Sequence, residues 1–193
     1  MVVLAIGVRP RTELVLNSRV TVNRGIVVDR FMRTTLPDVY ACGDVAEAYD
    51  LCFEGGRVLP QWPVAHMSGR VAGFNMAGEK REYPGGVVMS ALKYFDTPIV
   101  AAGRTSPEAS DEYEVLVAHD PAKALYKKAV LKNGVLQGFI MVGAIETAGI
   151  LFYLLRNDVD VTSCKDTLLV EGFGLVHLPD SVRKTMLIRR QMS

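Results

Sequence analysis

The stretch TTLPDVYACGD, residues 34–44, carries the strongest signal in this chain of 193 residues. Leu36-Pro37-Asp38 predicts a turn, and residues 39–42 predict a short buried strand after it. The strand would end at Gly43 and Asp44, where glycine permits close backbone approach and the carboxylate can accept hydrogen bonds from two hydroxyls. Because ligands of open α/β sheets bind at the carboxyl ends of the strands, this pattern predicts a site for a sugar-like chain.

A helix is predicted downstream, over residues 63–77. Pro63 suits the first helical position, and Gly78 suits the left-handed cap beyond the last one. The first amides of a helix lack intrahelical acceptors, so those of Val64, Ala65 and His66 are predicted to favour an anion, or a carbonyl oxygen that gains negative charge.

The rest of residues 1–80 alternates short apolar runs with glycine turns, a pattern typical of an α/β segment. Residues 2–6 and 26–29 predict strands, and residues 45–61 predict a loop. Met1 stands directly before the first apolar run, without the exposed residues that usually precede a core strand. We therefore expect that a preceding part of the protein is missing; a short domain that begins with its first strand is the alternative.

A second block begins after residues 79–86, which predict a linker. Residues 87–193 predict an α+β domain, with strands over 87–94, 99–102 and 113–118. The clearest element is a hairpin of residues 126–132 and 135–142, because an Asn-Gly pair, here Asn133-Gly134, suits the two positive φ angles of a tight turn. Helices are expected over residues 144–156 and 181–189.

Composition excludes several classes of protein. Lys plus Arg number 22 against 21 Asp plus Glu, so nucleic acid and anionic membrane surfaces are not expected partners. No apolar run approaches the length of a membrane-spanning helix. Cys42, Cys52 and Cys164 follow no pairing pattern, which favours reduced thiols in a cytoplasmic protein over a disulfide scaffold or a metal site.

The stretch 34–44 resembles the second flavin-binding motif of the pyridine nucleotide–disulfide oxidoreductase family, a Thr-x-x-Pro-x-aliphatic-aromatic-Ala-x-Gly-Asp pattern. The sequence matches it from Thr34 and Pro37 to Asp44. Residues 5–10 resemble the strand by which that family returns to its FAD domain. The helix after Pro63 resembles the flavin-facing helix, and the hairpin of residues 127–143 is similar to the C-terminal domain.

This resemblance implies a partial FAD-binding domain segment, residues 1–80, followed by a small C-terminal interface domain, residues 87–193, with an antiparallel sheet and helices. Asp44 would hold the ribityl hydroxyls of FAD. The amides of Val64 and Ala65 would face the pyrimidine edge of the flavin, with Gly43 and Pro63 completing the site. NADH or NADPH, the electron donor, would bind outside this chain, and no catalytic or metal-binding residue is implied within it.

Two features of the family are absent from the sequence. The Gly-x-Gly-x-x-Gly loops for the ADP half of FAD and for NADH do not occur; Gly172-Phe173-Gly174 predicts a plain turn, because His177 stands where the third glycine belongs. The His-Pro pair of glutathione reductase–type members is also missing. This indicates the branch that resembles NADH oxidases, rubredoxin reductases and the nitrite reductase large subunit, with the electron acceptor unidentified.

Two functions follow from these predictions. In the first, the chain is the C-terminal part of an FAD-dependent NAD(P)H oxidoreductase; it would associate with the missing N-terminal FAD and NAD domains, form a homodimer and be inactive alone. In the second, it is a stand-alone, non-catalytic interaction or dimerisation subunit. An unrelated α/β binding domain is a third interpretation.

Overall fold

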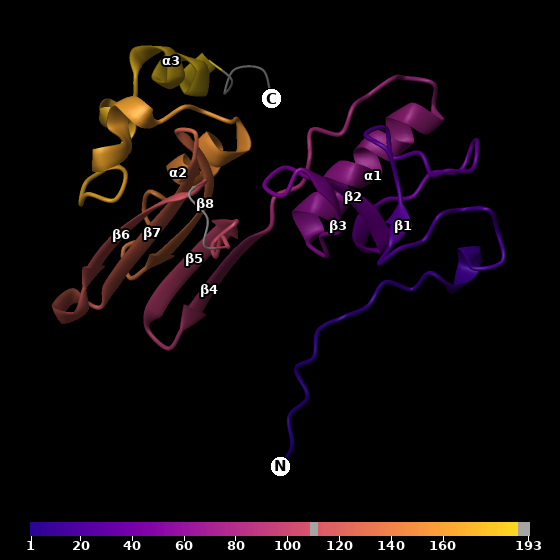
Figure 1. The fold of residues 1–193 in the computed structure, drawn as a ribbon, viewed down its shortest axis with the longest axis horizontal. Coiled ribbons are helices and arrows are strands. Elements are labelled where there is room, and N and C mark those ends of the chain that lie inside the picture. Colours follow the sequence, from indigo (N-terminus) through magenta and orange to yellow (C-terminus); the bar gives the residue numbers. More distant parts are fainter. Residues whose placement is uncertain (109–111, 189–193) are drawn as a thin grey trace. The chain divides into compact units, whose positions relative to one another are not determined.

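The computed structural model describes residues 1–108 and 112–188. The chain divides into two compact units, Met1–Val88 and Met89–Ser193, called unit 1 and unit 2 below (Figure 1). Residues 79–86, which end near this boundary, contain no helix and contribute a single bridge, between Gly86 and Asp50.

Unit 1 contains a three-stranded sheet and one long helix. β2 is central: it runs parallel to β1 and antiparallel to β3. The elements are β1 (Ile26–Val27), β2 (Ala46–Asp50), β3 (Gly55–Val58), α1 (Trp62–Met76) and the 3₁₀ turns η1 (Glu13–Val15) and η2 (Gly43–Val45). The predicted helix is confirmed and begins one residue earlier than expected, and Gly78 beyond its end has the left-handed φ of 85°.

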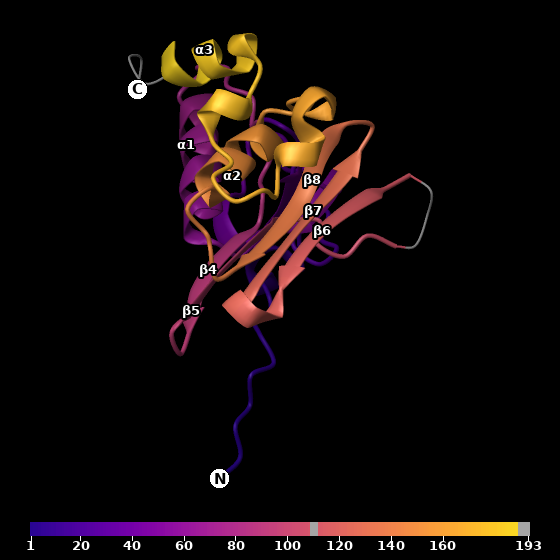
Figure 2. The same ribbon diagram turned by 90° about the vertical axis from the view of Figure 1, so that its left-hand side faces the viewer.

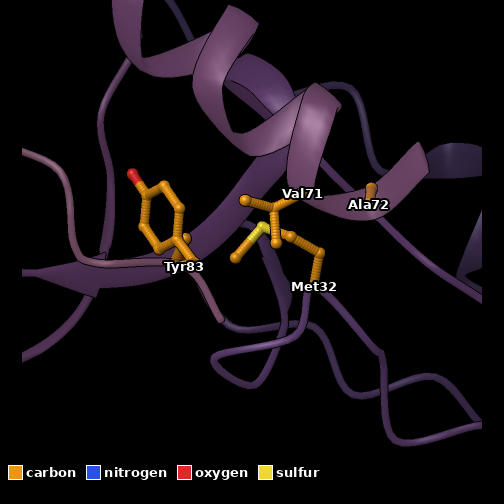
Figure 3. Close-up of a cluster of buried hydrophobic side chains, with 5 residues drawn as sticks. Met32, Val71, Ala72 and Tyr83 are labelled. Carbon is orange, nitrogen blue, oxygen red and sulfur yellow. The ribbon is translucent and has the colours of Figure 1, made fainter. Parts of the chain in front are cut away.

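The larger core cluster of unit 1 joins four parts of the chain. Met32 comes from a loop, Ala48 from β2, Val71 and Ala72 from α1, and Tyr83 from the stretch after the helix. Figure 3 shows the side chains of Met32 and Val71 meeting beside the Tyr83 ring. Because the Tyr83 amide also donates a hydrogen bond to a carbonyl oxygen of the loop, at 2.6 Å to Arg30, the irregular stretch 79–86 is fastened to the core.

Two buried carboxylates on β2 organise the surrounding loops. The Oε2 of Glu47 accepts hydrogen bonds from the amides of Arg24 and Gly25, at 2.9 and 3.1 Å. Asp50, 1% exposed, accepts from the Cys52 amide at 2.9 Å and pairs with Arg57 at 3.0 Å. Burial raises the pKa of Asp50, and the hydrogen bonds from Cys52 and Arg57 offset this only in part.

These carboxylates explain why the prediction of a loop over residues 45–61 is wrong. The segment contains β2 and β3, and four of the five residues of β2 are buried. Charged residues are rarely buried unless they are paired, so Glu47 and Asp50 made a buried strand look like a solvated loop.

Two strand predictions in unit 1 are also wrong. Residues 2–6 form an exposed coil, and none of the strands that the structure describes pairs with them. Residues 39–42 make only an isolated bridge, from Tyr40 to Arg33. Their backbone forms hydrogen bonds with residues 32–34, on the other side of the Pro37-Asp38 turn, and does not pair with the sheet. The 3₁₀ turn η2 therefore lies at the start of strand β2 and not at the end of a strand.

Unit 2 is an antiparallel sheet of five strands in the order β4-β5-β8-β7-β6. The predicted strands and hairpin are confirmed: β4 (Met89–Tyr94), β5 (Thr97–Gly103), β6 (Glu114–Asp120), β7 (Leu125–Lys132) and β8 (Val135–Val142). Asn133 and Gly134 have φ angles of 51° and 76°, as the hairpin turn requires. A Cβ on Gly134 would collide with the Thr162 hydroxyl, so the turn is also packed tightly.

Helix α2 covers one face of this sheet and contacts β8 and β5 (Figure 2). The helical elements of unit 2 are α2 (Ala148–Arg156), α3 (Asp180–Ile188), η3 (Pro121–Lys123), η4 (Thr162–Thr167) and η5 (Leu175–His177). Helix α2 begins four residues later than predicted, and Arg189, the last residue of the second predicted helix, lies outside the described residues. Phe139, Leu151 and Leu154 are fully buried between helix and sheet.

Candidate functional site

The Gly43–Val45 turn is fastened to the first half of helix α1. The Gly43 amide donates to the Ser68 hydroxyl at 3.0 Å, and that hydroxyl donates to the Ala65 carbonyl oxygen at 3.0 Å. Ser68 is 2% exposed, so this small network is shielded from water. It fixes the position of the turn relative to the helix.

Glycine and small side chains allow the turn and the helix to approach closely. Gly43 has a φ of 74°, and a Cβ built on it would lie 3.8 Å from the Ala65 Cβ. The sulfur of Cys42 lies 3.9 Å from the place of a Cβ on Gly69. Position 43 therefore favours glycine for its backbone conformation, and a larger residue at 65 would push the turn away.

The five predicted site residues differ in exposure. Asp44 and Pro63 are exposed, Gly43 and Ala65 are half-buried, and Val64 is buried. The structure brings Gly43 and Ala65 together, and Asp44 follows on the same turn with its carboxylate open to solvent.

Two of the three predicted donors, the amides of Ala65 and His66, are wrong, because both have intrahelical acceptors in a helix that begins at Trp62. Helix α1 begins at Trp62, and the Ala65 amide donates to the carbonyl oxygen of the capping residue Gln61 at 2.9 Å. An amide that donates its hydrogen bond within the helix is not available to donate one to a ligand. The first-turn amides left without an intrahelical acceptor are those of Trp62 and Val64, since Pro63 has no amide hydrogen.

One residue of this region escaped the sequence analysis. Ser68 was passed over because a serine within a helix has no distinctive pattern; only its distance from Gly43 shows its role. Trp62 is 80% exposed and stacks on His66, with ring centroids 5.6 Å apart. An exposed tryptophan beside free amides adds a flat apolar surface to the site.

The thiols do not form a second reactive centre. Cys42 is half-buried, and Cys52 and Cys164 are buried. Burial, followed by the nearby Asp160 carboxylate, raises the pKa of Cys164, which disfavours the reactive thiolate. Within residues 1–108 and 112–188 no group of acidic, histidine and cysteine side chains could hold a metal ion, and no helix there is long and apolar enough to cross a membrane.

The remaining candidates have structural roles. Gly172 lies in a turn, as predicted, and the Gly174 amide donates to the ring nitrogen Nδ1 of His177 at 3.1 Å. The site thus offers an exposed carboxylate acceptor and helix-end amide donors, without a nucleophile. Such an arrangement can bind and polarise a ligand that carries both hydroxyls and carbonyl oxygens.

Comparison with known families assigns the chain to a class. Residues 1–69 match the sequence model described as pyridine nucleotide-disulphide oxidoreductase, and residues 89–159 match the rubredoxin NAD+ reductase C-terminal domain. The chain belongs to the pyridine nucleotide-disulphide oxidoreductase family. A solved structure that the chain resembles in fold, from Desulfovibrio vulgaris, is of an FAD-dependent pyridine nucleotide-disulphide oxidoreductase; the match covers 95% of this chain and 48% of that one, with a TM-score of 0.71 and 24% identity.

Individual relatives agree with this class. The chain is 31% identical to a nitrite reductase [NAD(P)H] of Bacillus subtilis (strain 168), and the match covers 84% of this chain and 19% of the relative. It is 34% identical to a NADH-rubredoxin oxidoreductase of Clostridium acetobutylicum, and that match covers 53% of this chain and 25% of the relative. The crystal structure of NADH:rubredoxin oxidoreductase from the same species matches 81% of the chain and 38% of its own, with a TM-score of 0.59 and 27% identity. The chain thus spans between a fifth and two fifths of these relatives.

Proposed function

We propose that the chain supplies one wall of an FAD site, and an interface domain, to an NAD(P)H-dependent oxidoreductase. The turn of Gly43 and Asp44 would hold the sugar-alcohol part of FAD, and the first turn of α1, with Pro63, Val64 and Ala65, would lie against the flavin ring. The Ala65 contribution is its small side chain, because its amide is bonded within the helix. We expect the assembled protein to be cytoplasmic and homodimeric.

One observation carries this proposal: the Ser68 hydroxyl fastens the Gly43 turn to helix α1 and leaves the Asp44 carboxylate exposed beside it. The donor set fits FAD. A carboxylate suits paired ribityl hydroxyls, and helix-end amides stabilise negative charge on a flavin carbonyl oxygen. Glycine at 43 leaves room for a chain to pass the backbone closely.

FAD, when bound, supplies the electron transfer between NAD(P)H and an acceptor. This chain's residues would bind and orient it: Asp44 accepts hydrogen bonds from hydroxyl groups, and the Val64 amide donates one. We expect no NADH oxidation by the 193 residues alone, because the sequence contains neither dinucleotide-binding loop.

The test compares this chain with the protein expressed from the whole coding sequence that contains it. We expect flavin absorbance bands in the longer protein, bleached by NADH, and a colourless 193-residue chain. A colourless longer protein, or the absence of any longer coding sequence, would contradict the proposal.

The role of Asp44 is tested in the longer protein. Asp44→Asn should lower the FAD content of the purified protein, because the amide replaces one acceptor oxygen by a donor. Asp38→Asn, an exposed aspartate on the preceding turn, is the matched control and should keep the wild-type flavin content. Equal flavin content in both variants would remove Asp44 from the site.

A non-catalytic interaction subunit is the second candidate, favoured by exposed apolar residues on the β4–β5 hairpin. Leu92, Tyr94 and Phe95 are 53%, 65% and 83% exposed. Sedimentation velocity on the 193-residue chain tests it: a concentration-dependent dimer that Phe95→Ser abolishes would support this role. A monomer at all concentrations would exclude self-association through the hairpin.

A further inference from the structure

A buried lysine lines a pocket of unit 2 that no part of the proposed FAD site uses. The pocket holds about 230 Å³ and lies where strand β6 turns through η3 into β7. Lys127, on β7, lines it while only 8% exposed. At about 30 Å³ per water molecule, this volume matches a ligand of several heavy atoms.

The strand geometry explains why Lys127 is buried. Side chains alternate along a strand, so Lys127 shares its face with Ala129 and Leu131, which are 0% and 1% exposed. Its antiparallel partner on β8, Met141, is 1% exposed. The aliphatic stem therefore lies in the apolar layer of the sheet, and the ammonium group retains contact with solvent at the pocket.

The acidic groups of the same pocket are already paired. Asp120 Oδ1 accepts hydrogen bonds from the amides of Ala122 and Lys123, at 3.1 and 3.3 Å. Glu171 pairs with the Lys123 ammonium at 3.5 Å, and both side chains are largely exposed at the rim. Among residues 1–108 and 112–188, Lys127 makes no ion pair or side-chain hydrogen bond. Of the two lysines in this pocket, Lys127 is thus the one whose charge meets no carboxylate in the described chain.

Apart from His119, the other walls of the pocket are apolar. Ala118 and Leu125 come from β6 and β7, Ala144 follows β8, and Leu169 lies beyond η4. A Cβ on Gly143, which has a φ of 84°, would lie 2.6 Å from the Leu125 Cδ2, so glycine at this position leaves room for the leucine. Walls that keep water away strengthen the attraction between the Lys127 ammonium and an anion, and apolar walls favour a ligand with a hydrocarbon body.

We propose that this pocket binds a small carboxylate with a short hydrocarbon body, whose anionic end pairs with Lys127. A carboxylate supplies the missing counter-charge, and its carbon chain contacts the alanine and leucine walls. Inorganic phosphate offers the charge without the apolar contact, and an alcohol of equal length offers the contact without the charge. Both should bind more weakly than the carboxylate.

The experiment titrates the ¹⁵N-labelled 193-residue chain with sodium butyrate and follows its amide resonances, with sodium chloride added to matched ionic strength. We expect saturable shifts at Ala118, Leu125, Ala144 and Leu169. Lys127→Met, which keeps the stem and removes the charge, should weaken binding about tenfold or more. Lys128→Met is the matched control, because this neighbouring, half-buried lysine does not line the pocket and should leave affinity unchanged.

Two further variants keep the test decisive if Lys127→Met does not fold. Lys127→Arg retains a cation and should still bind butyrate, whereas Lys127→Gln should not. Absence of saturable shifts in the wild type, or unchanged affinity in Lys127→Gln, would overturn the proposal. So would phosphate or butanol binding as tightly as butyrate.

Discussion

The two units bury different kinds of groups. In unit 2, Phe139, Leu151 and Leu154 form a continuous apolar layer between α2 and the five-stranded sheet. Unit 1 has short strands, and its loops are tied together by the buried carboxylates of Glu47 and Asp50. Removing a large side chain from an apolar layer leaves a cavity that its neighbours fill only in part, whereas altering a shared carboxylate leaves individual amides without an acceptor.

The largest expected effect is the loss of packing in unit 2. Phe139→Ala should lower the free energy of unfolding by about 3–5 kcal/mol, because a fully buried ring leaves a cavity. Hydrogen exchange by mass spectrometry should show the lost protection in residues 89–188 and not in residues 1–88. Phe95→Ala, an exposed phenylalanine of the same unit, should change stability by less than about 0.5 kcal/mol. Equal effects of the two substitutions would contradict the picture of one apolar layer.

Removing a charge from unit 1 should cost somewhat less. Glu47→Gln replaces a carboxylate that accepts from the Arg24 and Gly25 amides and from the Asn23 side chain. One amide end of glutamine must face a donor, so we expect a loss of about 2–3 kcal/mol, measured by urea unfolding. Glu54→Gln, an exposed glutamate of the same unit, is the control and should be neutral. Exchange protection should fall in residues 20–50; a uniform loss across both units would disprove the separation.

Glycines in the two units should respond in opposite directions. Gly134→Ala should destabilise unit 2 by more than about 1 kcal/mol, because φ is 76° and the new Cβ would meet Thr162. Gly73→Ala should stabilise α1 by about 0.5–1 kcal/mol, since nothing lies within 4 Å of its Cβ position. Thermal unfolding of both variants measures the difference, and a destabilised Gly73→Ala variant would show that α1 tolerates no side chain there.

The smallest expected effect is on the pH dependence of stability, to which Asp50 in unit 1 and Asp160 in unit 2 contribute with opposite sign. Burial raises the pKa of Asp50 above its ordinary 3.8, so the folded unit 1 binds the proton more tightly and loses that stabilisation as pH rises through the raised value. Hydrogen bonds from the Thr162 side chain and amide lower the pKa of Asp160, so its contribution to unit 2 is present above 3.8 and is lost as pH falls below it.

Carbon-13 titration of the two carboxyl groups measures this directly. We expect a midpoint above 3.8 for Asp50 and one below 3.8 for Asp160. Asp50→Asn should remove the pH dependence of unit 1 above 3.8, and Asp160→Asn that of unit 2 below it. Midpoints on the same side of 3.8 would contradict the assigned environments.

Sequence patterns predicted unit 2 better than unit 1 for a physical reason. Strands β4 to β8 pair with neighbours within the same 105 residues, and the Asn133-Gly134 turn specifies its own hairpin. Residues 2–6 show the same apolar pattern, but a strand forms only where another strand accepts its hydrogen bonds. A local apolar pattern therefore indicates that a segment can form a strand, but it does not show whether another strand is available to pair with it.

The candidate site was predicted in part for a similar reason. Gly43, Asp44 and the helix after Pro63 are visible in the sequence because turns and caps require particular residues. Ser68 and the bonded amide of Ala65 depend on where the helix begins and on a contact between residues 25 positions apart. Such contacts are properties of packing, which single-residue patterns do not encode.

The strand order of unit 2 has a consequence for how quickly it folds. β4–β5, β6–β7 and β7–β8 are hairpins between consecutive strands, whereas β5 pairs with β8, as in Ile99 with Val142. Closing that long loop costs chain entropy unless the β6–β7–β8 meander forms first and shortens it. The meander should therefore be structured in the transition state, and β4 should join the sheet late. Substitutions that destabilise the β7–β8 turn should therefore slow the folding of unit 2. Substitutions that weaken the pairing of β4 should chiefly speed its unfolding.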